Sequence, residues 1–125
     1  MKVLIVEKNR KKGDRIASSL PADTAVTRAS NPDTAVDLYM TAKIEKNPYD
    51  YVISGIGAFV SHFRSMEKKL NGKIDIPAKI VYAADKNGFR SVLEAYENGA
   101  NAFVGPEISY STLSEGFDMC GVAKS

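Results

Sequence analysis

The sequence predicts an α/β domain, built on a doubly wound parallel sheet of five strands with helices on both faces. Segments with strand composition and segments with helical spacing alternate five times along 125 residues, an order typical of parallel sheets joined by helical crossovers. The first segment, 2–6, is a continuous aliphatic run, which indicates a strand buried on both faces. We expect one domain, 1–125, that stands alone or belongs to a longer protein.

The first half of the chain has well-marked helix starts. Asn9 is suited to cap a helix over residues 10–20, which Pro21 ends. After a weaker strand, 24–29, the segment 30–33 combines a capping side chain, a proline in the first turn and an acid near the positive end of the helix. The apolar side of that second helix comprises Ala35, Val36, Tyr39 and Ala42.

The second half repeats the alternation three times. Strands are predicted at 51–53, 79–82 and 102–104. Apolar residues at helical spacing follow each strand, namely Phe59, Phe63, Met66 and Leu70, then Phe89, Val92, Leu93 and Tyr96, then Leu113 and Phe117. Asn71-Gly72 and Asn98-Gly99 are typical helix stops, and Gly116 and Gly121 weaken the last helix.

The composition argues against several classes of function. The net charge is +2, with acids and bases mixed along the chain, which favours neither nucleic acid nor a membrane surface as a partner. The longest aliphatic run is far too short to span a bilayer or to act as a signal peptide. Cys120 is the only cysteine and His62 the only histidine. An internal disulfide and a histidine metal cluster are therefore excluded, and a cytoplasmic protein is expected.

The carboxyl ends of the strands are where a parallel sheet places its functional groups. The segments KVLIVEKN, NPYDYVISG and IPAKIVYAAD…ENGANAFVGP end at these positions, in this order and spacing. With them the chain resembles, over nearly its whole length, the receiver domains of two-component response regulators, the CheY-like family. The resemblance implies a flavodoxin-like (βα)5 fold with strand order 2-1-3-4-5.

The resemblance also implies a set of site residues, from which this chain departs. A working receiver has two acids after the first strand that hold Mg²⁺, an acceptor Asp ending the third, a Ser or Thr after the fourth and a Lys before a proline after the fifth. Here Glu7 keeps one acid, Lys8 replaces the other, and Gly55 stands at the acceptor position. Residues 77–90 hold no Ser or Thr, and Gly105 or Pro106 replaces the lysine.

These departures predict a receiver-like domain without a phosphoacceptor and without catalytic residues. Phosphoryl transfer needs a nucleophile and a metal, and a glycine offers no nucleophile. We expect no cofactor and no Mg²⁺ binding, because one carboxylate beside a lysine is a poor magnesium site. The residues expected at the vestigial pocket are Glu7, Lys8, Gly55, Ala83, Gly105 and Pro106.

Lys8 has two interpretations. Its ammonium could lie near Glu7 in the place of the metal and hold the fold in one state, or it could be a solvated lysine at a helix start. The basic run Lys8, Arg10, Lys11, Lys12 and Arg15 likewise fits an acidic partner or a solvated helix start.

Four other polar residues flank the expected pocket. Ser54 should point to the other side of the sheet from Gly55 and be packed or hydrogen-bonded, and His62 should be exposed on the third helix. Asp50 fits a structural acid before the third strand, and Asp85 is suited to cap the fourth helix.

The fourth helix, fifth strand and fifth helix form the usual output surface in the resembled family. Here that surface would include Lys86, Arg90, Glu94, Phe103 and Tyr110. Phe103 matches an aromatic position that reports phosphorylation in working receivers, although the same residue also suits the core. The implied partner is a signalling protein, namely a kinase, an output domain or an adaptor target, bound by a monomer or weak homodimer.

The predicted function is a phosphorylation-independent interaction module, with three alternatives. A phosphorylatable regulator with an unusual site needs an acidic nucleophile after the third strand, and none lies between Tyr51 and Met66. A small-ligand sensor would use the space vacated around Gly55, Ala83 and Glu7. A flavodoxin-like enzyme would need a Ser/Thr/Gly-rich phosphate cradle, which the loop after the first strand lacks.

Overall fold

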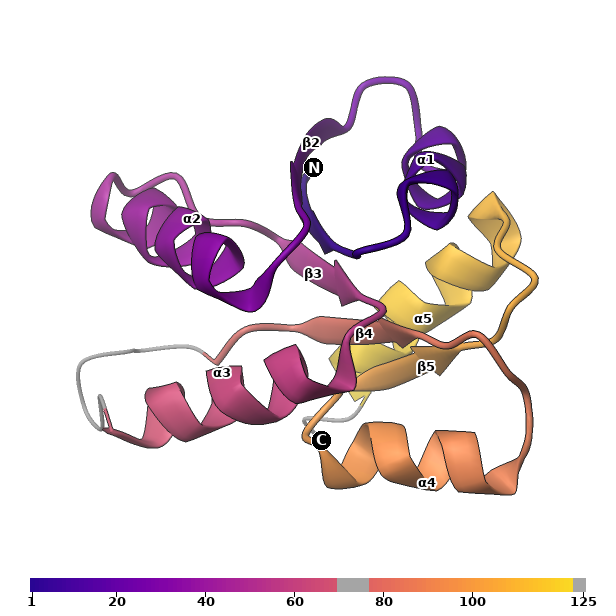
Figure 1. Ribbon diagram of the computed structural model, residues 1–125. Helices are drawn as coiled ribbons and strands as arrows, with labels where there is room; N and C mark the ends of the chain where they lie inside the picture. The colour runs from indigo at the N-terminus through magenta and orange to yellow at the C-terminus, as the bar shows by residue number, and fades with distance from the viewer. Residues whose placement is uncertain (70–76, 123–125) are drawn as a thin grey trace.

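The computed structural model describes residues 1–69 and 77–122, which form a parallel sheet flanked by helices (Figure 1). The strand order is β2-β1-β3-β4-β5, which confirms the predicted order. The strands are β1 Lys2–Val6, β2 Ala25–Ala29, β3 Tyr51–Ser54, β4 Ile80–Ala83 and β5 Ala102–Val104. The helices are α1 Arg10–Ser18, α2 Pro32–Ile44, α3 Gly57–Lys69, α4 Phe89–Glu97 and α5 Tyr110–Val122. The expected contact of Leu70 and the stop at Asn71-Gly72 lie outside the described residues.

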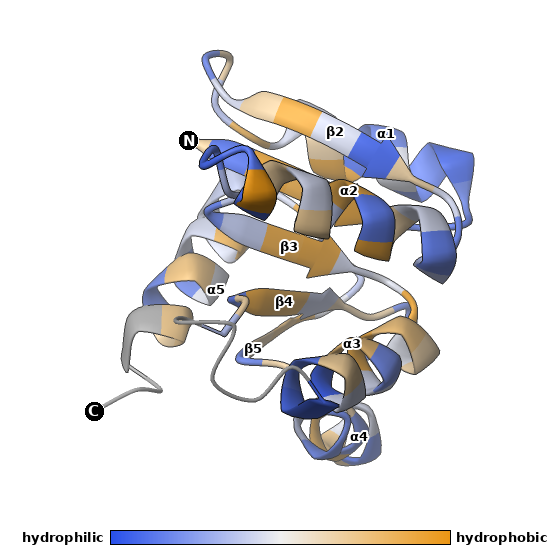
Figure 2. Ribbon diagram, turned by 90° about the vertical axis from the view of Figure 1, so that its left-hand side faces the viewer, coloured by the Kyte–Doolittle hydropathy of each residue, from blue (hydrophilic) through white to orange (hydrophobic). Residues whose placement is uncertain are grey.

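The sheet separates two hydrophobic clusters because side chains alternate along each strand. Leu4 and Val6 of β1 pack with α2, α3 and the buried Ala95 of α4. Val3 and Ile5 point the other way and pack with α1 and α5. In Figure 2 the central strand β3 is strongly hydrophobic, whereas the edge strand β2 is mixed, as expected for a sheet covered on both faces whose edge meets solvent.

The predicted helix starts of α1 and α2 are confirmed. Asn9 Oδ1 accepts a hydrogen bond from the Lys12 N–H at 3.2 Å, and Asn31 Oδ1 accepts one from the Thr34 N–H at 2.9 Å, with Pro32 following. The prediction that Asp85 caps α4 is wrong: the N-cap of α4 is Gly88, which provides no side-chain hydrogen bond. Asp85 has another partner, which belongs to the site.

Helix α4 turns most of its apolar residues outward. Phe89, Leu93 and Tyr96 are 82%, 44% and 39% exposed, although their spacing is that of a packed amphipathic face. The small residue Ala95 is the buried one, and it allows α4 to lie close to the short strand β5. The larger side chains of α4 are therefore left on the surface.

Candidate functional site

The ends of β1 and β3 bring Glu7 and Gly55 together. Val6 pairs with Ser54 in the sheet, and the Gly55 N–H donates to Val6 O at 3.0 Å, so the two following residues are neighbours. The Glu7 carboxylate lies over Gly55: a Cβ at position 55 would overlap with Oε1 of Glu7 and would approach Lys12 Nζ. Glycine at position 55 therefore leaves the space that the Glu7 side chain fills.

A lysine ammonium lies beside this carboxylate. Lys12 Nζ donates to Ala83 O at 2.6 Å and to Asp85 Oδ1 at 2.8 Å, and it lies 3.1 Å from Glu7 Oε1. The side chains of Lys12 and Glu7 are only 6% and 7% exposed, whereas that of Asp85 is 81% exposed. The other Glu7 oxygen, Oε2, accepts from the Asn9 N–H at 3.0 Å. We call Glu7, Lys12, Gly55, Ala83 and Asp85 the strand-end cluster.

Of the two interpretations of Lys8, the structure agrees with the solvated lysine at a helix start, and the interpretation that Lys8 supplies this ammonium is wrong. Lys8 is exposed in the loop before α1, and the buried ammonium belongs to Lys12, in the first turn of the helix. Side chains on a helix lean toward its N-terminus, so a residue in the first turn of α1 reaches back over the strand ends. The signal was present in the sequence: Lys12 is four residues before Ile16 and so shares its buried face.

Gly105 and Pro106 lie at the end of β5, away from this ammonium. The Asn87 side chain covers Gly105, because a Cβ there would overlap with Asn87 Oδ1. Pro106 O accepts a long hydrogen bond of 3.4 Å from the Arg15 guanidinium. The space beside Gly105 is thus occupied by Asn87 of the β4–α4 loop, a residue that sequence reasoning did not single out.

Ser54 and His62 are placed as expected. Ser54 is fully buried, and its Oγ accepts from the Ile56 N–H at 3.0 Å and donates to Ile56 O at 3.1 Å. His62 is exposed on α3. Asp50 holds the start of β1, since its Oδ2 accepts from the Lys2 N–H at 2.8 Å. None of these three residues offers a group to the strand-end cluster.

The donor set of the strand-end cluster does not fit Mg²⁺. Magnesium binds through one or two carboxylates together with waters and phosphate oxygens. Here the only buried carboxylate faces an ammonium, and position 55 contributes no oxygen from a side chain. Residues 1–69 and 77–122 also contain no group of three His, Cys, Asp or Glu side chains that could hold a metal.

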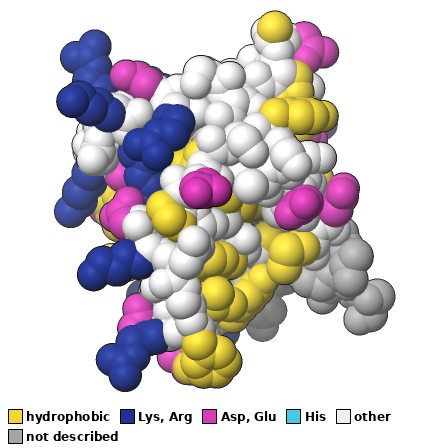
Figure 3. All heavy atoms as spheres, turned by 90° about the vertical axis from the view of Figure 1, so that its right-hand side faces the viewer, with side chains coloured by type: hydrophobic (Ala, Val, Ile, Leu, Met, Phe, Trp, Pro, Cys, Tyr) yellow, Lys and Arg dark blue, Asp and Glu magenta, His cyan; other side chains and the backbone are white. Residues whose placement is uncertain are grey.

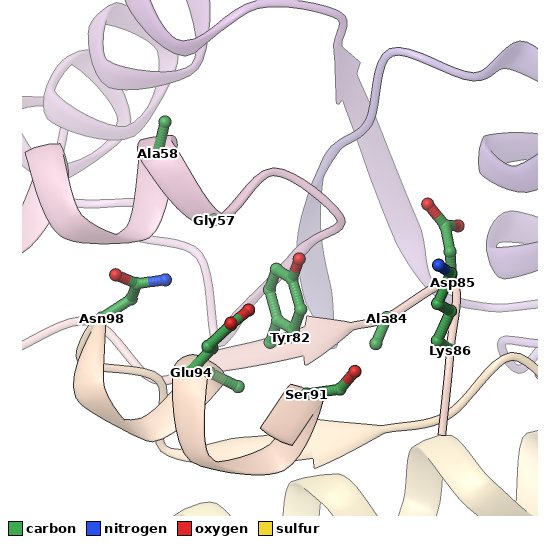
Figure 4. Close-up of a pocket in the computed structure, with 10 residues that line it drawn as sticks. Gly57, Ala58, Tyr82, Ala84, Asp85, Lys86, Ser91, Glu94 and Asn98 are labelled. Carbon is green, nitrogen blue, oxygen red and sulfur yellow. The ribbon is translucent and has the colours of Figure 1, made fainter. Parts of the chain in front are cut away.

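A polar cavity of about 330 Å³ opens beside the cluster, between the start of α3 and helix α4 (Figure 4). Tyr82 and Glu94 face each other across it, with Asn98 at one end and Lys86 at the other. Burial raises the pKa of the Tyr82 phenol, and the nearby Lys12 charge partly opposes this. The cavity does not reach Glu7, Gly55 or Ala83, so it is not the vacated pocket that the sequence suggested.

The predicted output surface is exposed in most of its residues. Lys86, Arg90 and Glu94 are exposed and Tyr110 is 58% exposed, whereas Phe103 is partly buried against the core. Figure 3 shows the side of the molecule toward which the strands run in Figure 1. Hydrophobic side chains gather in the lower half of this view. Sequence reasoning missed the exposure of Phe89, Leu93 and Tyr96, because it treated their spacing only as evidence for a helix.

Comparison with known proteins gives a fold. No protein-family model and no curated protein matches the chain. A structure described as that of an atypical orphan response regulator with a phosphorylation-independent regulatory mechanism does match, with a TM-score of 0.70 at 18% identity over 97% of this chain and 96% of that one. The chain has the receiver fold of response regulators.

Two further structures agree with the receiver fold. The chemotaxis response regulator CheY4 of Vibrio cholerae matches with a TM-score of 0.67 at 20% identity, over 95% of this chain and 97% of its own. A two-component response regulator from Clostridium difficile gives a TM-score of 0.69 at 18% identity, over 98% and 96%. In addition, no helix among the described residues is long and apolar enough to cross a membrane.

Proposed function

We propose that this chain is a receiver-like module that acts without phosphorylation, by binding a signalling protein through the surface of α4, β5 and α5. The observation that carries the proposal is the strand-end cluster. The acceptor position is a glycine, the space above it holds the Glu7 carboxylate, and Lys12 neutralises that carboxylate. With no nucleophile and no fitting metal site, the domain lacks both groups that phosphoryl transfer requires, and we propose no enzymatic activity.

The same contacts support a domain held in one state. Lys12 links α1 to the end of β4 through Ala83 O, and to the β4–α4 loop through Asp85. A buried ion pair is strongly destabilised when one partner is removed. The cluster therefore favours one arrangement of the loop that leads into α4, independently of any phosphoryl group.

The surface of α4 supports a protein partner. Phe89, Leu93 and Tyr96 leave apolar area in contact with water, flanked by the exposed charges of Arg90 and Glu94. Apolar patches bordered by charged residues are typical of protein interaction sites. The structural neighbour described as phosphorylation-independent is consistent with this function.

The alternatives have less support. Phosphorylation at Ser54 would require a buried hydroxyl that is already engaged with Ile56. A ligand sensor built on the vacated pocket would require free space, but Glu7, Lys12 and Asn87 fill it.

The test is a comparison of backbone amide NMR spectra with and without Mg²⁺ and beryllofluoride, a mimic of aspartyl phosphate. A phosphorylatable receiver treated in the same way serves as the positive control. We expect no saturable shift in this chain, because neither the acceptor nor the metal ligands are present. Saturable shifts that extend from Glu7 to Phe103 would overturn the proposal, since they would require a surviving phosphoryl-type site.

A further inference from the structure

A second surface of the molecule carries unbalanced positive charge. A groove of about 300 Å³ opens at the carboxyl ends of β1 and β2, on the other side of the strand-end cluster from α4. We call it the β1–β2 groove; its lining residues are Ile5, Glu7, Lys8, Arg10, Arg28, Ala29 and Ser30. Figure 3 shows basic side chains along one margin of this side of the molecule.

Two cations of the β1–β2 groove, Lys8 and Arg10, form no ion pair with the described residues. In residues 1–69 and 77–122, the exposed side chains of these two residues also make no hydrogen bond. The one acid in the lining, Glu7, is buried and already faces Lys12. A ligand that enters this groove therefore meets the ammonium of Lys8 and the guanidinium of Arg10, neither of which is in an ion pair with the described residues.

Arg28 is the one groove cation that is partly engaged. It pairs with the exposed Asp14 and donates to Arg10 O at 3.1 Å, which holds its guanidinium beside the first turn of α1. The Arg28 side chain is still 39% exposed. It can accordingly form a second hydrogen bond on its open side, since a guanidinium carries five N–H donors.

The basic residues at the start of α1 destabilise this helix. The first turn of this helix contains no acid and begins Arg10-Lys11-Lys12, so like charges meet the positive end of the helix dipole. An incoming anion at this end would relieve that repulsion and would interact favourably with the helix. Arg28 also links β2 to α1 through Asp14 and Arg10 O, whereas Lys8 and Arg10 make no ion pair or side-chain hydrogen bond within residues 1–69 and 77–122 that would account for their position beside the groove.

We infer that the β1–β2 groove binds an acidic segment of a partner protein, in which neighbouring carboxylates meet Lys8, Arg10 and Arg28. Carboxylates match the planar guanidinium groups of arginine. A long nucleic acid fits less well: no aromatic side chain lines the groove for base stacking, and the net charge of the chain is only +2. The inference does not rest on the proposed function, because neither phosphorylation nor the surface of α4 enters it.

The test is fluorescence anisotropy of a labelled hexaglutamate peptide titrated with the full chain at about 20 mM and about 200 mM salt, where charge contacts are weakly and strongly screened. Hexaglutamine and a six-nucleotide single strand serve as competing probes. The variant Lys8→Gln/Arg10→Gln is compared with Lys68→Gln/Lys69→Gln, which removes the same charge from exposed positions near the end of α3. Thermal unfolding verifies that both variants are folded.

We expect hexaglutamate to bind at low salt and more weakly at high salt, and hexaglutamine not to bind. Loss of Lys8 and Arg10 should weaken binding about fivefold, the effect of two exposed ion pairs, while the α3 control retains it. Equal weakening in both variants would overturn the inference, since binding would then follow net charge alone. Tighter binding of the oligonucleotide, or no binding of hexaglutamate, would also overturn it.

Discussion

The strand-end cluster buries charged side chains, whereas the outer side of α4 exposes apolar ones. At the strand ends, Glu7 and Lys12 are charged groups with side chains only 7% and 6% exposed. On α4, Phe89 is an aromatic side chain that is 82% exposed. Buried charges destabilise a fold unless they are paired. Apolar surface contributes to stability only when it is removed from water. The charges of Glu7 and Lys12 are thus paired within the chain, whereas the apolar side chains on the outer side of α4 are exposed to solvent.

The largest effect is expected from a substitution that breaks the strand-end cluster. Lys12→Met should lower the free energy of unfolding by about 3–5 kcal/mol, because it leaves the Glu7 carboxylate buried without its cation. Urea unfolding measures the change. The neighbouring exposed residue provides a matched control, since Lys11→Met should change stability by less than about 0.5 kcal/mol.

The double variant Lys12→Met/Glu7→Gln sharpens this prediction. Removing the charge on residue 7 should recover part of the loss, because no buried ion then remains unpaired. If Lys12→Met and Lys11→Met proved equally stable, the ion pair would have no energetic importance and the contrast between the two regions would fail.

An intermediate effect is expected from filling the space above Gly55. Gly55→Ala should destabilise the protein by about 1–3 kcal/mol, because the added methyl group must displace the Glu7 carboxylate from Lys12 and from the Asn9 N–H. The same substitution made in a Glu7→Ala background should cost less than about 0.5 kcal/mol, since the obstructing carboxylate is absent. An equal cost in both backgrounds would mean that Glu7 does not occupy this space.

The smallest effect is expected on α4. Phe89→Ser should leave the free energy of unfolding within about 0.5 kcal/mol of the original, because an exposed ring contributes little to the fold. Phe59, a fully buried residue of α3, is the matched control, and Phe59→Ser should cost at least about 3 kcal/mol. A large loss from Phe89→Ser in urea unfolding would show that this side chain is part of the core and not of a free surface.

Local signals explain why the fold was predictable. The caps at Asn9 and Asn31 and the aliphatic strand 2–6 act within a few residues, so the sequence contains them directly. The glycine at position 55 and the lack of a hydroxyl in 77–90 could be identified in the same way.

Two features that were not predicted, the identity of the buried lysine and the outward face of α4, depend on contacts that are distant in sequence. Lys12 meets Ala83 and Asp85 across more than seventy positions. The spacing to Ile16 places Lys12 on the buried face of α1, but it does not reveal which groups the ammonium will meet. For α4, the helical spacing of apolar residues is the same whether their side of the helix packs on a sheet or lies in solvent. Only the narrow contact through Ala95 decides between them, and that contact depends on the neighbouring strand.

The ammonium of Lys12 differs from a dissolved cation in one further respect. A metal ion fills its site to a degree that depends on its concentration in the surrounding solution, and it exchanges with other ions. Lys12 is covalently attached, so its effective concentration beside Glu7 is fixed by the chain itself. Under the proposed function, changes in magnesium or in phosphate donors would therefore leave the occupancy of this site unaltered. The concentrations of the protein and of its partner would then set how much complex forms.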